Sequence, residues 1–160
     1  MAASAVNIER RGADALDELE PLWHALKNHH GACTPDVPVR SDDESWALRR
    51  RDYQRWLAEP GAFLLVARAG GRTVGYALVR IEEAGPTWTE PGRMAIVQDI
   101  AVAESARGGG IGNALIDRVE GESGCDVVQL SVLSVNASAK AFYERLGFEP
   151  FVEVLRRRAQ

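Results

Sequence analysis

Apolar residues recur with a helical period in the first third of the chain and in two later segments. The first helix is expected between Asp14 and Gly31, with four large apolar side chains on one face: Leu16, Leu19, Trp23 and Leu26. A second helix is expected over residues 41–58, because Ser41 and Glu44 have the spacing of a capping box and Pro60-Gly61 follows. Similar patterns predict helices after residue 110 and over residues 136–145.

The remaining pattern is typical of β-strands. Residues 62–83 contain two runs rich in β-branched and aromatic residues around Ala69-Gly70-Gly71-Arg72, which is a hairpin signal. Further strands are predicted by four shorter segments: residues 5–10, 93–102, 127–133 and 151–157. The element order is therefore β-α-α-β-β-β-α-β-α-β. This order and the length predict one α/β domain over residues 1–160, with a mixed sheet.

Four glycines lie in the six residues Arg107-Gly108-Gly109-Gly110-Ile111-Gly112, between a predicted strand and a predicted helix. The first amides of a helix have no intrahelical partner and carry partial positive charge. Glycines at this point let backbone amides approach a phosphate, and Arg107 adds a cation. The segment does not fit a Walker loop or a dinucleotide fingerprint. The sequence predicts a phosphate or pyrophosphate site here; the alternative is a flexible surface loop.

Composition narrows the functional class only slightly. The formal net charge of −4 does not indicate a nucleic-acid partner. Two cysteines, Cys33 and Cys125, are expected to be free thiols, and no metal-binding cluster is predicted. We see no secretory signal and no apolar run long enough to cross a bilayer. These observations predict a cytoplasmic protein with no metal and no membrane partner.

Two motifs together resemble the GCN5-related N-acetyltransferase (GNAT) family. The glycine segment resembles the family signature Arg/Gln-x-x-Gly-x-Gly/Ala, and "QDIAV" before it resembles the family's fourth strand. Downstream, "VNASAKAFYERLGFEP" resembles the family's second motif. The resemblance implies an α/β fold with a mixed, mostly antiparallel sheet, flanked by helices and splayed between strands 4 and 5. It also implies that acetyl-CoA binds in this opening.

The resemblance assigns residues to acetyl-CoA position by position. The backbone of Ile100, Ala101 and Val102 is expected to bind the pantetheine arm. The pyrophosphate is expected on the amides of Arg107, Gly108, Gly109, Gly110, Ile111, Gly112 and Asn113. Asn136 and Lys140 are expected on the cofactor side. The resemblance also makes a homodimer an expected assembly.

Two residues are candidates for the chemistry. The resemblance implies that Tyr143 approaches the thioester sulfur, and a phenol is protonated at neutral pH, so Tyr143 is the predicted general acid. Asp99 is the candidate base; alternatively, its carboxylate is structural. Strand alternation predicts that Asp99 shares one face with Val97 and Ala101. Some family members carry Glu where this chain has Ile96, and others have one where this chain has Ser131.

The amine acceptor is expected to meet the N-terminal half of the chain. Candidate substrate-binding residues are His29, His30, Arg40, Trp46, Glu82 and Trp88. Each has a plainer alternative: the histidines as a solvated helix end, Trp46 as core, Glu82 as a solvated charge, and Trp88 as a subunit contact. Of the run Arg49-Arg50-Arg51, only Arg50 is expected on the inward stripe.

The sequence thus predicts an acetyl-CoA-dependent N-acetyltransferase that acts on a primary amine, with a small molecule as the expected acceptor. One alternative is an enzyme that acetylates protein lysines or N-termini. The other is a module that binds acyl-CoA without catalysis.

Overall fold

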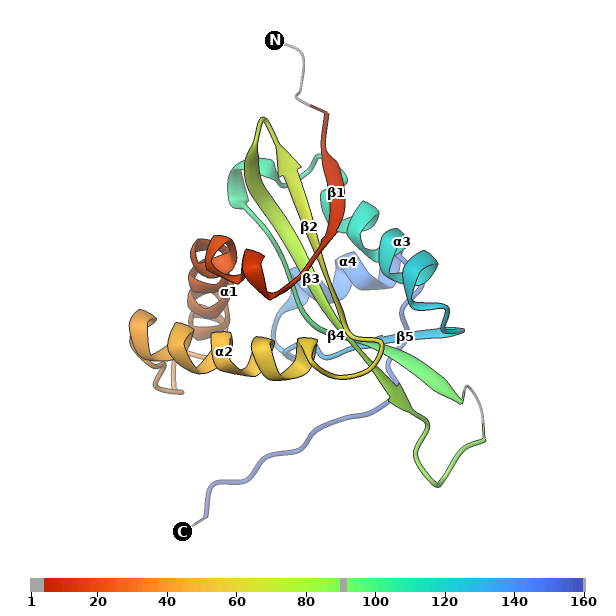
Figure 1. Ribbon diagram of the computed structural model, residues 1–160. Coiled ribbons are helices and arrows are strands. Elements are labelled where there is room, and N and C mark those ends of the chain that lie inside the picture. Colours follow the sequence, from red (N-terminus) through yellow and green to blue (C-terminus); the bar gives the residue numbers. More distant parts are fainter. Residues whose placement is uncertain (1–4, 90–91, 160) are drawn as a thin grey trace.

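Five strands form one sheet in the computed structural model, which describes residues 5–89 and 92–159 (Figure 1). The strands follow one another in the order β1-β2-β3-β4-β5. Their bounds are β1 (Asn7–Arg11), β2 (Phe63–Ala69), β3 (Arg72–Glu83), β4 (Arg93–Val102) and β5 (Val127–Leu130). The α-helices are α1 (Glu20–Cys33), α2 (Asp42–Leu57), α3 (Ile111–Ser123) and α4 (Ala137–Arg145), with short 3₁₀ helices η1 (Ala13–Leu19) and η2 (Glu104–Ala106). The predicted α/β class and mixed sheet are confirmed.

Local signals along the chain predicted several element boundaries correctly. The Ser41 hydroxyl accepts a hydrogen bond from the Glu44 amide at 3.4 Å and donates to the Glu44 carboxylate at 3.0 Å, which completes the predicted capping box of α2. The predicted hairpin joins β2 to β3, and Gly70 and Gly71 both have positive φ there. The first predicted helix is divided, because residues 13–19 form η1 and the α-helix begins at Glu20.

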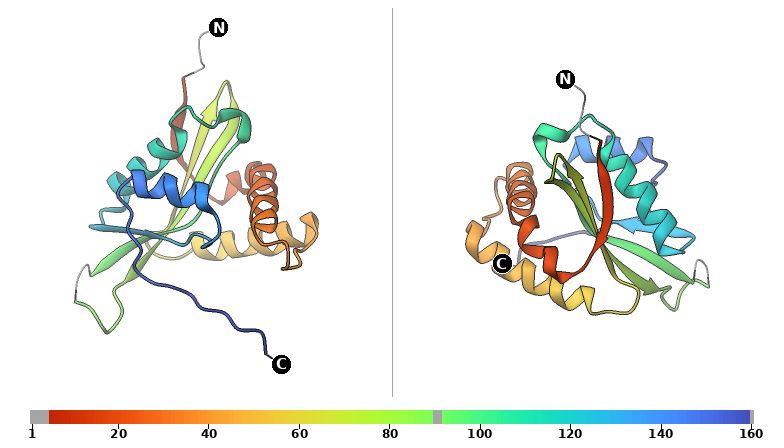
Figure 2. Two further views of the ribbon diagram at one scale, coloured as in Figure 1. Left: turned by 180° about the vertical axis from the view of Figure 1, so that it is seen from behind. Right: turned by 45° about the horizontal axis from the view of Figure 1, so that its top comes forward.

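Helices cover both faces of the sheet (Figures 1 and 2). On one face, η1, α1 and α2 pack their apolar side chains against Leu64, Val66, Tyr76 and Leu78. On the other face, α3 packs against Leu65, Ala67, Ala77 and Val79. α4 lies beside α3 on this second side (Figure 2). Among the residues described, no helix combines the length and the apolar character needed to cross a bilayer.

β4 and β5 separate partway along their length. β5 pairs in parallel with β4 from Met94–Val127 to Val97–Leu130, and the pairing stops there. β4 continues to Val102 beside β3 alone, so its last five residues have no strand on the β5 side. The predicted splay between the fourth and fifth strands is therefore present, and it leaves backbone polar groups of β4 open toward a gap.

A β-bulge in β4 changes which face Asp99 occupies. The register with β3 shifts between Leu78 and Val79, which pair with Asp99 and Val97, so Gln98 is the extra residue. Val97 packs with the α3 side, whereas Ala101 packs with the α1–α2 side. The prediction that Val97 and Asp99 share a face was wrong, because simple alternation ignores the bulge. Asp99 points toward α1 and α2.

The final predicted strand, residues 151–157, is not formed. Residues 149–159 are extended but take part in no strand pairing in the described structure. Leu155 is 90% exposed and Val154 is 91% exposed. The β-rich pattern correctly indicated extended backbone. A strand also needs a neighbouring strand for its hydrogen bonds, and the part of the chain that the structure describes pairs none with this segment.

Candidate active site

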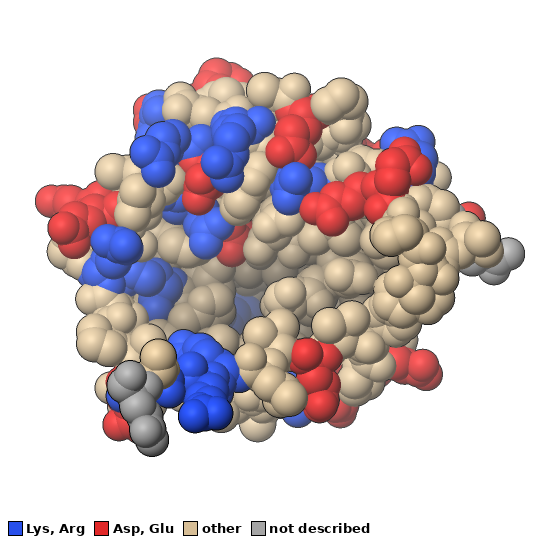
Figure 3. All heavy atoms as spheres, turned by 90° about the horizontal axis from the view of Figure 1, so that it is seen from below, with Lys and Arg blue, Asp and Glu red and all other residues tan. Residues whose placement is uncertain are grey.

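A cavity of about 900 Å³ lies where β4 and β5 separate. The cavity wall is formed by the C-terminal half of β4, the glycine segment, the N-terminal half of α3, α4 and one side of α1. The cavity therefore brings together segments that are up to about 120 residues apart in the chain. Seen from below, the molecule is hollowed at its centre, and basic side chains gather along the left half of the rim (Figure 3).

The glycine segment shapes one end of the cavity. Gly108 has φ +79° and Gly110 has φ +78°, a backbone conformation that favours glycine over any residue with a side chain. α3 begins immediately afterwards, so the amides of Ile111, Gly112 and Asn113 have no partner within the helix. The Arg107 guanidinium donates to the Val102 carbonyl at 3.2 Å, which ties the segment to the end of β4. This geometry suits an anion.

Gly112 has a different role, because it permits close helix packing. A Cβ atom at this position would lie 3.0 Å from the ring of Phe142 on α4. The absence of a side chain therefore lets α4 approach the first turn of α3, where both helices line the cavity.

The left-handed conformation gives a stability prediction. We expect Gly110→Ala to lower the free energy of unfolding by about 1–2 kcal/mol, because a Cβ is strained at this φ. Gly121, in the last turns of α3, is the matched control: it has no atom within 4 Å of an added Cβ and no positive φ, so Gly121→Ala should be neutral or stabilise by up to about 1 kcal/mol. Urea unfolding of the three proteins measures both effects. Equal changes in the two variants would contradict the interpretation.

The unpaired part of β4 presents backbone groups to the cavity. The Ala103 amide donates to the Val74 carbonyl of β3 at 2.8 Å. Because hydrogen-bonding direction alternates along an antiparallel ladder, Ala101 also faces β3, whereas Ile100 and Val102 face the side that β5 has left. The Ile100 amide is thus available to a bound molecule in the gap.

Asp99 is held in a largely buried network of polar groups. The Tyr53 hydroxyl donates to Asp99 Oδ2 at 2.7 Å and lies 2.9 Å from the Tyr76 hydroxyl. Arg49 Nη1 lies 3.6 Å from the same carboxylate oxygen. Burial raises the pKa of Asp99 to about 6, although the charge of Arg49 and the hydrogen bond from Tyr53 act in the opposite direction. Asp99 also lines the cavity, so it is a carboxylate that exchanges a proton near neutral pH.

Arg49 was missed as an inward residue by the sequence analysis. Its guanidinium lies 4.4 Å from the Trp23 ring centroid and 5.4 Å from that of Trp56. The sequence did contain a signal, since Arg49 is three residues after Trp46 and four before Tyr53 and therefore shares their helix face. Arg50, the arginine that was expected on the inward stripe, forms a salt bridge with Asp17 at 2.7 Å.

Tyr143 and Asn136 border the cavity from the α4 side. The Tyr143 ring packs edge-on against Phe142 and Phe148, and burial raises its pKa to about 12. Tyr143 therefore keeps its proton throughout the neutral range.

The Asn136 side-chain oxygen accepts hydrogen bonds from the Ala139 amide at 3.2 Å and from the Ser138 hydroxyl at 3.1 Å, so it caps α4.

His29 and His30 line the cavity at the C-terminal end of α1. His30 is partly buried, and burial lowers its pKa, with smaller effects of the same sign from His29 and Arg49. His29 Nε2 lies 3.8 Å from Cys33 Sγ. The structure thus brings this pair into the same cavity as Asp99, Tyr143 and the glycine segment.

The other candidate residues lie elsewhere. On the cofactor side, Gly109 and Lys140 do not border the cavity, whereas the remaining predicted residues do. Among the substrate candidates, Trp46 is buried in the core with Tyr53, and Glu82 pairs with Arg80 at 2.9 Å. The backbone carbonyl of Arg40 accepts from Lys27, and Trp88 packs on Phe151 at 5.2 Å between ring centroids. We do not assign these six residues to the site.

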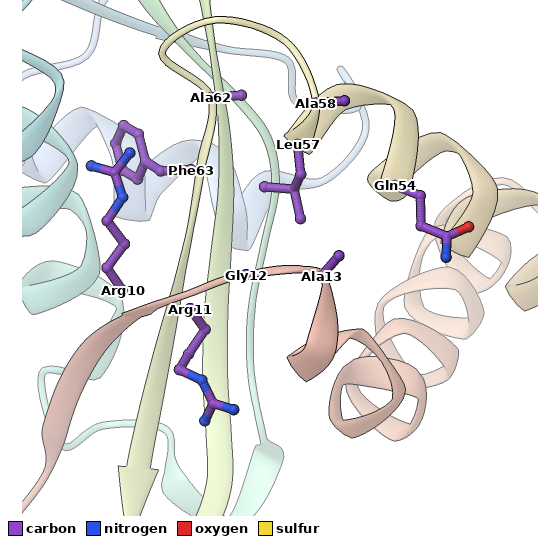
Figure 4. A pocket seen from close by; sticks show the side chains of 9 residues that line it. All are labelled: Arg10, Arg11, Gly12, Ala13, Gln54, Leu57, Ala58, Ala62 and Phe63. Carbon is purple, nitrogen blue, oxygen red and sulfur yellow. The ribbon is translucent and has the colours of Figure 1, made fainter.

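A second, smaller cavity of about 310 Å³ lies between the end of β1 and the C-terminal end of α2 (Figure 4). Its two arginines are already engaged: Arg11 pairs with Asp14 and Glu9, and the Arg10 guanidinium stacks on the Phe63 ring at 4.8 Å. In Figure 4 the two arginines lie apart, with Arg10 beside Phe63. Its lining holds no carboxylate, histidine or cysteine. The larger cavity is therefore the candidate active site.

Comparison with known proteins agrees with this geometry. The model of the acetyltransferase (GNAT) family matches residues 23–148, which is most of the chain. The chain belongs to the GNAT family. GNAT acetyltransferases take an acetyl group from acetyl-CoA.

Two curated relatives are named mycothiol acetyltransferases. The chain is 34% identical over 115 residues to that of Saccharomonospora viridis, and 32% identical over 145 residues to that of Salinispora tropica. These matches cover 70% and 87% of this chain but only 37% and 42% of the relatives. The chain therefore spans about two-fifths of the length of these relatives.

Solved structures share the GNAT fold over nearly the whole chain. A variant of the BH1408 protein from Bacillus halodurans has a TM-score of 0.81 at 19% identity, covering 96% of this chain and 99% of the other. Aminoglycoside N-acetyltransferase AAC(6')-Iy in complex with CoA has a TM-score of 0.70 at 21% identity, covering 99% and 97%. At these identities the likeness establishes the fold.

The cavity of this GNAT protein fits acetyl-CoA by its own features. The free amides of α3 and the cation of Arg107 suit a pyrophosphate. The unpaired edge of β4 offers alternating donors and acceptors to the amide groups of a pantetheine arm. Among residues 5–89 and 92–159, no group of His, Cys, Asp and Glu side chains is arranged to hold a metal ion.

Proposed function

We propose that this protein transfers the acetyl group of acetyl-CoA to the primary amine of a small molecule by direct attack. One observation carries the proposal: a single cavity joins an anion-binding helix terminus to a buried carboxylate, Asp99, and to the phenol of Tyr143. The open edge of β4 connects these two ends.

Acetyl-CoA supplies an activated acetyl group as a thioester, whose thiol is displaced by the amine. Asp99 accepts the proton that the attacking nitrogen loses, directly or through a water molecule. The Ile100 amide donates a hydrogen bond to the carbonyl oxygen as negative charge develops on it. Tyr143 gives its proton to the departing sulfur. Asp99 thus gains one proton and Tyr143 loses one in each turnover, and proton exchange with solvent restores both groups.

A small-molecule acceptor is supported by two comparisons. Curated relatives are named mycothiol acetyltransferases, and a structural neighbour is an aminoglycoside N-acetyltransferase that was solved with a bisubstrate analogue, CoA-S-monomethyl-acetylneamine. The site also departs from family members that act on protein N-termini, because it has Ser131 at the position of their fifth-strand glutamate.

The proposal is tested by thiol release from acetyl-CoA across a panel of aminoglycosides, amino sugars, cysteine derivatives, polyamines and short peptides. Release that depends on a non-peptide amine supports the proposal. Release only with peptides would identify a protein acetyltransferase instead. Heat on titration with acetyl-CoA, without release for any amine, would identify a binding module.

Arg49 should influence the pH above which the Asp99 carboxylate can accept a proton. The guanidinium lowers the pKa of Asp99, while burial and the nearby Asp52 raise it. Arg49→Gln should therefore raise this pKa and move the acid limb of kcat/KM upward by about one pH unit. Arg51→Gln, an exposed change on the same helix, is the control. The acid limb is measured from pH 5 to 8 with the amine found in the panel, and an unmoved limb in Arg49→Gln would count against Asp99 as the base.

A further inference from the structure

The two oxygens of the Asp99 carboxylate have different surroundings. Oδ2 accepts the hydrogen bond from the Tyr53 hydroxyl at 2.7 Å, and Arg49 Nη1 lies 3.6 Å from the same atom. Oδ1 has no hydrogen-bond partner among the described residues, yet it is not sealed in the interior. The only buried side-chain polar atom without a partner in that part of the chain is His24 Nε2. Since Asp99 lines the cavity, Oδ1 is the oxygen that is open to it.

The hydrogen bond to Oδ2 has a fixed direction. A hydroxyl has one proton and an ionised carboxylate can only accept, so the proton of Tyr53 lies on the bond to Asp99. The Tyr76 hydroxyl, 2.9 Å away, then donates to the Tyr53 oxygen. Both tyrosines are fully buried, so each hydroxyl needs such a partner. The three side chains form one line of hydrogen bonds from β3 through α2 to β4.

The Tyr53 ring is held on several sides by other aromatic rings. It packs against Trp46 and Trp56 of its own helix, with ring centroids 6.3 Å and 6.0 Å away, and against Tyr76 of β3 at 6.2 Å. A phenylalanine would fill the same apolar space, so packing alone does not account for the hydroxyl. A rigid ring with a hydroxyl at its tip is suited to holding a side chain on the neighbouring strand in one orientation.

We infer that Tyr53 is the positioning residue of the base: it holds Oδ2 of Asp99 and thereby aims Oδ1 at the attacking amine, while Tyr76 fixes the direction of the Tyr53 O–H bond. The inference rests on the proposed function, in which Asp99 is the base. The nitrogen loses its proton to Oδ1, and the Tyr53 proton stays on the bond to Oδ2. A base held at one oxygen keeps the other in the geometry that proton transfer needs.

The same contact favours the ionised form of the base. Burial raises the pKa of Asp99, and the charge of Arg49 and the hydrogen bond from Tyr53 limit this rise. Removing the Tyr53 hydroxyl should therefore raise the pKa of Asp99 further. The other titratable groups around this carboxylate belong to α2, β3 and α1: Asp52, Tyr76, His29 and His30.

The first test is the titration of Asp99 itself, followed by the NMR signal of its carboxyl carbon in the whole protein and assigned with Asp99→Asn. Tyr53→Phe keeps the ring and removes the hydroxyl, so the midpoint should rise by about one pH unit. Gln54→Ala, an exposed change at the next position of α2, is the control and should leave the midpoint unchanged. An unmoved midpoint in Tyr53→Phe would overturn the inference and leave Asp99 as the base. This experiment uses neither acetyl-CoA nor an amine, so its outcome is separate from that of the proposed function.

The second test separates the aim of the carboxylate from its charge. At pH 8, where Asp99 is ionised with or without the hydroxyl, Tyr53→Phe should lower kcat about tenfold and leave the KM for acetyl-CoA within about twofold. In an Asp99→Asn background the same substitution should change kcat less than about twofold, because no base remains to be aimed. An equal loss in both backgrounds would show that the hydroxyl only supports the packing, and would overturn the inference.

A further variant keeps the tests decisive if the single substitution prevents folding. Tyr53→Phe leaves the buried Tyr76 hydroxyl without its acceptor, which costs stability. Tyr53→Phe combined with Tyr76→Phe removes both hydroxyls, so no unpaired group is left, and the same shift and the same loss are expected. If the acid limb of kcat/KM did not follow the Asp99 midpoint in these variants, Asp99 would not be the base, and the proposed mechanism would fall together with the inference.

Discussion

Replacing Tyr143 with phenylalanine should lower kcat by about 10²- to 10⁴-fold, the range that general acids contribute. The variant keeps the ring, which packs edge-on against Phe142 and Phe148, and removes only the hydroxyl. Because burial raises the pKa of Tyr143 to about 12, the wild-type phenol holds its proton at every pH at which the enzyme would be assayed. The loss should therefore be the same across the neutral range.

Two measurements separate a catalytic role from a structural one. Titration calorimetry should show acetyl-CoA binding to Tyr143→Phe within a few-fold of the parent, because the glycine segment is untouched. Glu144→Gln, an exposed change on the same helix, should keep full activity. If Tyr143→Phe turned over normally, the assignment of the general acid would be wrong. If Tyr143→Phe lost both turnover and acetyl-CoA binding, the phenol would have a role in binding.

The second large effect is expected from Asp99→Asn, which should reduce kcat/KM by about 10²- to 10⁴-fold because the amide cannot accept a proton. The parent should lose activity as the pH falls through about 6, where Asp99 becomes protonated. The variant should lack this acid limb altogether. A pH profile of kcat/KM for both proteins checks the two statements together.

Asp99→Asn also has an expected effect on stability, in the opposite direction. The pKa of Asp99 is raised in the folded state, from 3.8 to about 6, so its contribution to stability is complete below pH 3.8 and is lost as the pH rises through about 6. A neutral amide avoids this loss. The variant should gain stability relative to the parent between pH 4 and 7, by an amount on the order of 1–3 kcal/mol. Urea unfolding of both proteins at pH 4 and at pH 7 measures this gain in stability. A variant that is less stable than the parent at pH 7 would indicate a structural role for the carboxylate.

Short-range signals predicted most of the fold. The capping box at Ser41, the hairpin glycines and the glycine segment before α3 act within a few residues, so their structural meaning can be read locally. The helical stripe also placed Leu19 and Trp23 in the core. The family resemblance added the splay between β4 and β5, which depends on how two distant strands pair and has no local signal.

Features that depend on contacts between distant segments were the ones the sequence did not predict. Arg49 was not expected on the inward stripe, yet Trp23 from another helix provides a ring for it to stack on. Trp46 and Trp88 were candidates for the substrate site. The structure instead buries Trp46 in the core and packs Trp88 on Phe151. The extra residue in β4 was invisible, because a bulge is defined only by the register with the neighbouring strand.

The bulge at Gln98 also determines which positions along β4 face the same side as Asp99. Ala95 and Val97 pack with α3, so Ile96 between them points to the opposite side, the same side as Asp99. Without the extra residue, positions 96 and 99 would lie on opposite faces. With it, they share one face three residues apart. A carboxylate at position 96 and one at position 99 would therefore face the same layer of the molecule, the one formed by α1 and α2.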